Sequence, residues 1–251
     1  MAPLAASPSC PPLAANGRPA IDPASLTHLE RCLESLPQTR QQHRRGQQYS
    51  WARHQLHRRI VAEVSAEGRC VHGQAPIALF SAGPPGAGKT TWLRQHAPGL
   101  LERLSLRIDA DALRAKLPED QGWNAAATQA EAGDLVTALL RSIGQPCRMN
   151  LLYDGTMTRP GRYLQLIPRL RQLGYRIHIV EIIVPEAVSQ RRVLERYQSS
   201  GRYVPAAVIQ EAYRNGPATV ARLRPLVDGS ILVDGATGAI RISSGAPLPH
   251  D

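Results

Sequence analysis

One stretch of sequence decides the fold of this chain: Gly83-Pro84-Pro85-Gly86-Ala87-Gly88-Lys89-Thr90. It has the form G-x-x-x-x-G-K-T, and it lies between the apolar run 77–82 and a segment that favours a helix. In that setting the pattern predicts a phosphate-binding loop, because glycines let backbone N–H groups wrap a phosphate at a helix N-terminus. An ordinary strand-to-helix turn would need neither the lysine nor the threonine.

The loop residues have separate expected roles. Lys89 is expected to reach the β and γ oxygens of a nucleoside triphosphate, and the Thr90 hydroxyl to coordinate Mg²⁺. The backbone of residues 83–90, together with Thr91, is expected to bind the rest of the triphosphate. The sequence therefore predicts ATP and Mg²⁺ as ligands of this loop.

Short apolar runs alternate with helical stretches on the carboxyl side of residue 76. Strands are expected at residues 77–82, 104–108, 149–153, 176–184 and 231–233, and helices near 89, 111, 124, 160, 186, 205 and 217. Such alternation is typical of a parallel sheet with crossover helices. We therefore expect an α/β fold with five parallel strands flanked by helices.

The amino-terminal part differs in composition. Residues 1–21 are rich in Ala, Pro and Ser and are expected to be a disordered tail, residues 22–75 a helical extension, and residues 76–251 the main domain. Ser50 can cap a helix whose apolar residues recur at helical spacing, with Arg53 and His57 mostly off that apolar face.

Carboxylates follow two of the expected strands. Asp109 and Asp111 come after the second strand, and Asp154 ends the third. Because carboxyl ends of parallel strands meet at one edge of the sheet, these groups should lie beside the loop. Asp111 is the stronger candidate for a general base, since Asp109 can simply cap the next helix. Asp154 has the position of a Walker B carboxylate that holds Mg²⁺, although an Asp-Gly turn is also a common strand end.

Three arginines lie after the fourth strand in a segment that suggests a lid. Arg192 and Arg196 are one helical turn apart, and Arg202 follows Gly201 in a loop. Guanidinium groups placed in this way can neutralise charge on a transferred phosphoryl group. In a chain this rich in arginine a solvated basic helix is the competing interpretation, and we accept it for Arg191.

The net charge of +10 raises the question of a polyanionic partner. Segment 159–224 has twelve Arg against four acids, and segment 40–59 has six Arg and no acid. Only 4% of residues are aromatic, which leaves little material for stacking on bases. The charge therefore favours triphosphate binding, with nucleic acid as the less favoured partner and genomic base composition as a neutral explanation.

The remaining features bear on location. Cys10, Cys32, Cys70 and Cys147 are far apart, with no pair at zinc spacing, so we expect reduced thiols in a cytoplasmic protein. Prolines break the first residues, which lack the pattern of a secretory signal, and no apolar run of about 18 residues predicts a membrane span. Export as an effector by another route stays open.

Together these motifs resemble the zeta-toxin family of P-loop kinases. The resemblance rests on the loop 83–90, the pair Asp109 and Asp111, the strand end Tyr153-Asp154-Gly155-Thr156, and the arginine segment 192–202. It implies the fold of a nucleoside monophosphate kinase and transfer of the ATP γ-phosphate to a hydroxyl of a small molecule. In the best-known cases the acceptor is UDP-N-acetylglucosamine, and an antitoxin protein inhibits the kinase.

The resemblance also implies roles for individual residues. Asp111 would take the acceptor proton, and Arg196 and Arg202 would bind the γ-phosphate, with Arg192 also near ATP. The acceptor would be bound by a further set of residues: Asp109, Glu131, Asp154 and Thr156. Asp134 competes with Glu131 for its place in the family pattern.

Other functions stay open on sequence alone. A polynucleotide 5′-kinase also has a D-x-x-R pattern like Asp111 to Arg114, and relatives phosphorylate NAD or other metabolites. A third alternative is a nucleotide-binding interaction protein without phosphotransfer.

Overall fold

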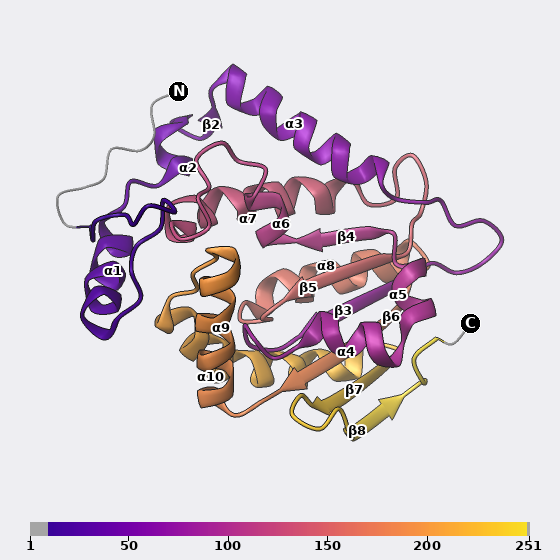
Figure 1. Ribbon diagram of the computed structural model, residues 1–251. Helices are drawn as coiled ribbons and strands as arrows, with labels where there is room; N and C mark the ends of the chain where they lie inside the picture. The colour runs from indigo at the N-terminus through magenta and orange to yellow at the C-terminus, as the bar shows by residue number, and fades with distance from the viewer. Residues whose placement is uncertain (1–9, 250–251) are drawn as a thin grey trace. The chain divides into compact units, whose positions relative to one another are not determined.

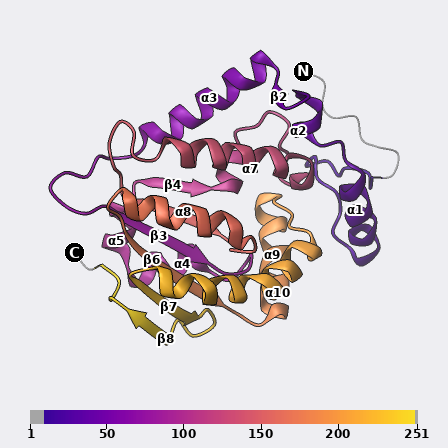
Figure 2. The same cartoon turned by 180° about the vertical axis from the view of Figure 1, so that it is seen from behind.

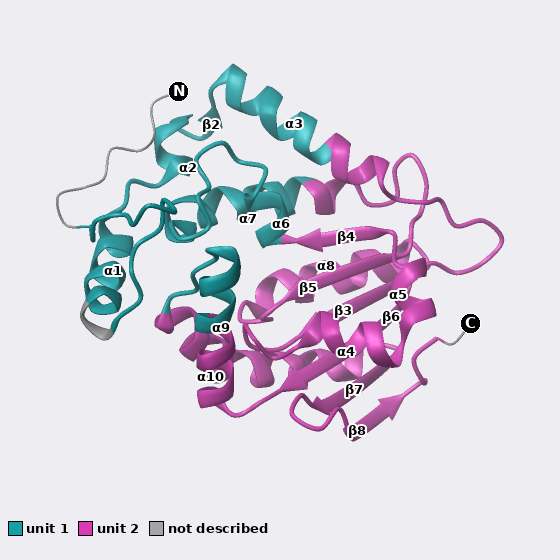
Figure 3. Cartoon of the chain, in the orientation of Figure 1, with its two compact units in different colours: residues 1–61, 110–138, 194–205 teal, residues 62–109, 139–193, 206–251 magenta. Residues whose placement is uncertain are grey.

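The computed structural model describes residues 10–249, and the chain forms two compact units. Unit 1 joins residues 1–61, 110–138 and 194–205, and unit 2 joins residues 62–109, 139–193 and 206–251 (Figure 3). Each unit is therefore assembled from three separate parts of the chain. This division cuts across the expected boundary at residue 75.

Unit 2 is built on a six-stranded sheet with the strand order β4-β5-β3-β6-β7-β8. The strands are β3 (Ile77–Ala82), β4 (Leu106–Asp109), β5 (Leu151–Gly155), β6 (Arg176–Ile183), β7 (Gly229–Asp234) and β8 (Ile240–Gly245). The first five are parallel, which confirms the expected α/β fold, and β8 pairs antiparallel with β7 at the edge. The apolar pattern missed β8 because every residue of that strand is exposed.

Helices cover both faces of this sheet. Figures 1 and 2 show α4 (Lys89–His96) and α5 (Pro98–Arg103) on one face, with α8 (Pro160–Gln172) and α10 (Ala206–Leu223) on the other. A 3-10 turn (Arg224–Leu226) follows α10, which continues through Pro217, where we had expected a new helix. No helix within residues 10–249 is long and apolar enough to cross a membrane.

Strand β3 lies in the middle of the sheet and is buried along its whole length. This explains its continuous apolar sequence, because a central parallel strand contacts helices on both faces. The loop that follows β3 therefore starts from a rigid position, while Asp154 and Asp109 lie at the ends of β5 and β4 on one side of it.

Unit 1 is mainly helical. It contains α1 (Pro23–Ser35), α2 (Thr39–Gln42), a small hairpin of β1 (Arg44–Arg45) and β2 (Gln48–Tyr49), and α6 (Ala110–Arg114). It also contains the first part of α3 (Trp51–Ala66), most of α7 (Ala125–Ser142) and the end of α9 (Glu186–Ser200). Its small apolar core consists of Leu29, Cys32, Leu33, Leu36, Trp123, Ala127, Tyr197 and Tyr203.

The segment 10–21 differs from the expected disordered tail, of which residues 1–9 lie outside the described part. Cys10 is joined to Cys32 of α1 by a disulfide, and Leu13 pairs with Pro19. The buried hydroxyl of Tyr197 donates a hydrogen bond to the carbonyl oxygen of Pro19, 2.6 Å away. The apolar residues of this segment show too little periodicity to predict packing, but a disulfide and a tyrosine distant in sequence hold the segment in place.

The expectation of reduced thiols is wrong, because all four cysteines are paired. The second disulfide joins Cys70 to Cys147 within unit 2. The Cα atoms are 4.7 Å apart in the first pair and 5.6 Å apart in the second, within the usual range for disulfides. Separations of 22 and 77 residues gave no sign in the sequence that the partners would meet.

Candidate active site

The phosphate-binding loop connects β3 to α4 and depends on glycine. Gly86 and Gly88 have φ angles of +75° and +90°, in the left-handed region that favours glycine. A Cβ atom on Gly83 would lie 2.1 Å from the carbonyl oxygen of Ile182, and one on Gly86 would lie 2.9 Å from that of Ser189. The loop thus has the tight backbone that turns successive N–H groups towards an anion.

Lys89 and Asp154 come together in unit 2. The Lys89 ammonium donates hydrogen bonds to the carbonyl oxygens of Gly83 at 3.1 Å and Pro84 at 3.4 Å, and it lies 3.7 Å from the Asp154 carboxylate. The Ser81 hydroxyl donates to the same carboxylate at 2.7 Å. The parallel register pairs Asp154 with Ser81 on β3 and with Asp109 on β4, so two of the three expected carboxylates lie side by side at the sheet edge.

The start of α9 packs on the phosphate-binding loop. Arg192 donates from Nη1 to the carbonyl oxygen of Gly86 at 3.2 Å, and the Ser189 hydroxyl donates to that of Pro85 at 2.6 Å. Arg192 is among the residues predicted from the sequence, whereas Ser189 is not, because a serine inside a basic helix gives no signal. Both contacts fix the outer rim of the loop.

Thr156 follows β5 at a point of unusual backbone. The next residue, Met157, is buried and has a φ angle of +54°, which a residue with a side chain rarely adopts. The Thr156 and Thr158 hydroxyl oxygens are 3.5 Å apart. Thr90 is half-buried and Thr91 is exposed at the start of α4.

Asp111 lies in unit 1, on the short helix α6, between two arginines. Its Oδ1 accepts a hydrogen bond from Arg114 Nη1 at 2.6 Å, and its Oδ2 forms an ion pair with Arg202. The two arginines differ in environment, since the Arg114 side chain is 4% exposed and that of Arg202 is 30% exposed. Arg196, one turn from the end of α9, is half-buried in the same unit.

Glu131 belongs to a buried charge cluster in unit 1. The Arg53 guanidinium binds both oxygens of Glu131, at 2.5 and 2.8 Å, and both oxygens of Glu119, at 2.9 and 2.8 Å. His57 lies 2.6 Å from Glu131, and His43 lies 3.0 Å from Glu119. The side chain of Glu131 is 0% exposed.

The cluster changes the acidity of its members. Burial opposes ionisation of Glu131, but hydrogen bonds from His57 and Arg53 outweigh it and lower the pKa of Glu131 to about 2. Burial is likewise outweighed at Glu119, where Arg53 and His43 lower the pKa. Burial alone would lower the pKa of Arg53, yet its two carboxylate partners raise it.

The sequence gives no sign of this cluster. The helical wheel of α3 left Arg53 and His57 off the apolar face, whereas the structure buries both. Periodicity assigns charged residues to solvent unless a partner is known, and Glu119 and Glu131 are more than 60 residues away. Asp134, the competitor of Glu131, pairs instead with Arg40 at 2.9 Å and accepts a hydrogen bond from Tyr49 at 2.7 Å.

The predicted site residues thus form two groups. Unit 2 contains Gly83, Pro84, Pro85, Gly86, Ala87, Gly88, Lys89, Thr90, Thr91, Asp109, Asp154, Thr156 and Arg192. Unit 1 contains Asp111, Glu131, Arg196 and Arg202. The first group has the chemistry to bind a triphosphate and a hard cation, and the second combines a carboxylate with guanidinium groups.

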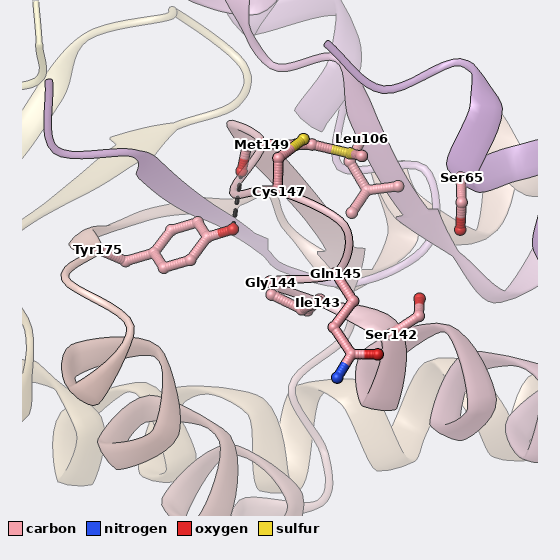
Figure 4. Close-up of a pocket in the computed structure, with 9 residues that line it drawn as sticks. All are labelled: Ser65, Leu106, Ser142, Ile143, Gly144, Gln145, Cys147, Met149 and Tyr175. Atoms are coloured by element: carbon pink, nitrogen blue, oxygen red, sulfur yellow. Dashed lines mark hydrogen bonds between the residues drawn. The ribbon is translucent and has the colours of Figure 1, made fainter. Parts of the chain in front are cut away.

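A small pocket in unit 2 contains none of these residues. It is lined by Ser65, Leu106, Ser142, Ile143, Gly144, Gln145, Cys147, Met149 and Tyr175 (Figure 4). Its volume of about 10 Å³ has room for about one water molecule. The Tyr175 hydroxyl donates a hydrogen bond to the carbonyl oxygen of Met149 at 2.9 Å. We therefore place no substrate in it.

Comparisons with known proteins agree with this fold. The chain is similar to the structure of the PezAT chromosomal toxin-antitoxin system of Streptococcus pneumoniae, with a TM-score of 0.60 and 20% identity over 81% of this chain and 85% of the other. It is also similar to AvrRxo1-ORF1 in complex with ORF2 and ATP, with a TM-score of 0.60 and 17% identity over 86% of this chain and 69% of the other. The same complex with sulphate ions gives a TM-score of 0.61 and 16% identity over 92% and 76%.

Sequence comparison gives the family. No curated protein sequence matches the chain. The zeta toxin profile, however, matches residues 61–234, which include the phosphate-binding loop, the carboxylates Asp109, Asp111 and Asp154, and the arginine segment. That match covers more than half of the chain, and the fold agrees with it, so the chain belongs to the zeta toxin family.

Proposed function

We propose that this protein is a toxin kinase that transfers the γ-phosphate of ATP to a hydroxyl group of a small molecule, with UDP-N-acetylglucosamine as the first acceptor to test. The observation that carries the proposal is the meeting of Lys89, the glycine loop and Asp154 at the carboxyl edge of the sheet. Membership of the zeta toxin family supports the same reaction class.

The residues of unit 2 fit ATP and Mg²⁺. Glycine keeps the loop tight, because a Cβ atom on Gly83 or Gly86 would collide with a neighbouring carbonyl oxygen. Such a loop can place backbone N–H groups around a phosphate. Thr90 and Asp154 offer a hydroxyl and a carboxylate, which are hard oxygen ligands of the kind that Mg²⁺ prefers. When bound, Mg²⁺ would neutralise charge on the phosphate oxygens. Lys89 would exchange its carbonyl partners for phosphate oxygens, with Arg192 nearby.

The acceptor would be deprotonated by Asp111. The hydroxyl oxygen of the acceptor forms the new bond to the γ-phosphorus, and the hydroxyl proton passes to the Asp111 carboxylate. The bond between the γ-phosphorus and the bridging oxygen breaks, and its electron pair leaves with ADP. Arg196 and Arg202 would neutralise the charge on the transferred group. Asp109, Asp154 and Thr156 would position the acceptor. Because Glu131 is fully buried, we propose that it supports the acceptor region from inside unit 1.

A protein partner and a location follow from the same proposal. The similar structures include a toxin-antitoxin system and a complex of two open reading frame products, so we propose an antitoxin that inhibits this chain. The two disulfides favour export of the protein over residence in the cytoplasm, because disulfides persist in oxidising compartments.

The kinase proposal can be tested with purified protein and radiolabelled Mg-ATP. UDP-N-acetylglucosamine, NAD, a cell metabolite extract and an oligonucleotide with a 5′-hydroxyl would be offered in parallel. We expect label on a small molecule, and Lys89→Met should lower the rate by roughly 10²- to 10³-fold because one charge that stabilises the transition state is lost. Transfer to the oligonucleotide alone would replace this proposal with a polynucleotide kinase, and stable ATP with no labelled product would end both.

A further inference from the structure

Arg114 is a buried residue of unit 1 that the proposed reaction does not yet use. It ends α6, three residues after Asp111, and its side chain is 4% exposed. Its guanidinium donates to Asp111 Oδ1 at 2.6 Å, to Asp120 Oδ1 at 3.1 Å and to the side-chain oxygen of Gln129 at 3.1 Å. Gln129 lies on α7 and Asp120 on the loop before it, so Arg114 is fixed from two directions behind Asp111.

The two oxygens of Asp111 are held in different ways. Oδ1 faces the buried Arg114, whose other donors are fixed by Asp120 and Gln129. Oδ2 faces Arg202, which is 30% exposed and therefore open to exchange with another anion. A buried guanidinium with three partners is expected to stay in place, whereas a half-exposed ion pair is weak and exchanges readily.

The loop that carries Arg202 is tied to the loop that carries Asp120. A Cβ atom on Gly122 would lie 2.9 Å from the carbonyl oxygen of Gly201, and the Tyr203 N–H group donates to the carbonyl oxygen of Gly122 at 3.4 Å. Asp111 is therefore linked to Asp120 through Arg114, and the loop of Asp120 is linked back to Asp111 through the loop of Arg202, all within unit 1. A displacement of Arg114 would therefore alter the contacts of both oxygens of Asp111.

We propose that Arg114 is the positioning residue of Asp111: it anchors Oδ1, so that Oδ2 is the oxygen that takes the acceptor proton once Arg202 has turned to the phosphate. This inference rests on the proposed kinase function. Arg202 covers the base before ATP binds, and Arg114 keeps the carboxylate aimed and ionised after Arg202 leaves.

The direct test is a carbon-13 NMR titration of the Asp111 carboxyl carbon, assigned by its loss in Asp111→Asn. Arg114→Gln should raise the pKa of Asp111 by roughly one unit or more, because a neighbouring guanidinium stabilises the charged form. Arg53→Gln is the matched control, since Arg53 is equally buried in unit 1 but binds Glu119 and Glu131. An Asp111 midpoint that stays where it is in folded Arg114→Gln overturns the inference, whether or not any acceptor is phosphorylated.

The kinetic test separates positioning from folding. With Mg-ATP and UDP-N-acetylglucosamine, the acid limb of the kcat profile should move up by the same amount in Arg114→Gln, while KM for ATP changes less than about twofold. Arg114→Lys should keep the acid limb but lower kcat roughly 10-fold, because one ammonium cannot hold all three partners. If Arg114→Gln does not fold, the double variant Arg114→Gln/Asp120→Asn also removes the carboxylate that would be left without its partner. In that variant a raised acid limb supports the inference, and an unchanged one overturns it. A uniform loss at every pH would show a merely structural residue.

Discussion

The two units bury different kinds of side chain. Unit 2 has a continuous apolar core on its sheet, with Leu79, Val180, Ile182 and Val233 almost completely inaccessible. Unit 1 has a smaller apolar core, and beside it a buried cluster in which one arginine binds two glutamates. The difference shows that unit 2 is specified by hydrophobic periodicity, whereas unit 1 needs particular polar partners from distant parts of the chain.

Breaking the disulfides should have the largest effect. In the loop-entropy account, removing the link between Cys70 and Cys147 should cost about 4.5 kcal/mol of unfolding free energy, and removing that between Cys10 and Cys32 about 3.4 kcal/mol. Urea denaturation of the two double Cys→Ser variants would measure both. Hydrogen exchange should in addition show that residues 10–36 open only in the variant that lacks the disulfide between Cys10 and Cys32.

The order of those two losses sharpens the comparison. If the shorter loop in unit 1 matters more than the longer one in unit 2, then its disulfide does more than restrict the unfolded chain. The Cys10–Cys32 disulfide would then also keep the segment 10–21 packed against Tyr197, because the small core of unit 1 cannot do so alone.

Removing the central charge of unit 1 should cost a comparable amount of stability. Arg53→Gln removes the guanidinium that binds both Glu119 and Glu131, and breaking a buried pair in this way costs about 3–5 kcal/mol. Arg40→Gln is the matched control, because its pair with Asp134 is 41% and 29% exposed and should contribute less than about 1 kcal/mol. Thermal unfolding of both variants gives the comparison, and equal small losses would contradict it.

The same contrast explains how much the sequence could predict. Five strands of unit 2 and the glycine loop follow from local patterns, since a buried strand needs an apolar run and the loop needs glycine at Gly86 and Gly88. The pairing of Arg114 with Asp120, of Arg53 with Glu131, and of the cysteines depends on the tertiary fold. Charged residues have no periodic signal that reveals their partners. The sequence could therefore indicate candidate site residues, but not which side chains they contact.

Acid should affect the two units in opposite directions, and between pH 3 and 7 this effect should be the smallest of the three. The pKa of Glu131 in unit 1 is about 2, below its ordinary value of 4.5, so its contribution is fully present above pH 4.5 and is lost as the pH falls towards 2. Burial raises the pKa of Glu181 on β6 of unit 2, although Arg224 counteracts it. The contribution of Glu181 is therefore greatest below pH 4.5 and is lost as the pH rises through its folded-state pKa.

The measurement is the unfolding free energy of Glu131→Gln and Glu181→Gln between pH 3 and 7. Glu131→Gln should destabilise at pH 7 and progressively less in acid, whereas Glu181→Gln should be neutral or stabilising at pH 7, because it removes a charge that burial disfavours. Each slope relative to the parent protein is limited to about 1.4 kcal/mol per pH unit, since one proton is involved. Slopes of the same sign would mean that the charge of Glu131 is no better compensated by its neighbours than the charge of Glu181. That result would contradict the difference between a unit with paired buried charges and a unit with an apolar core.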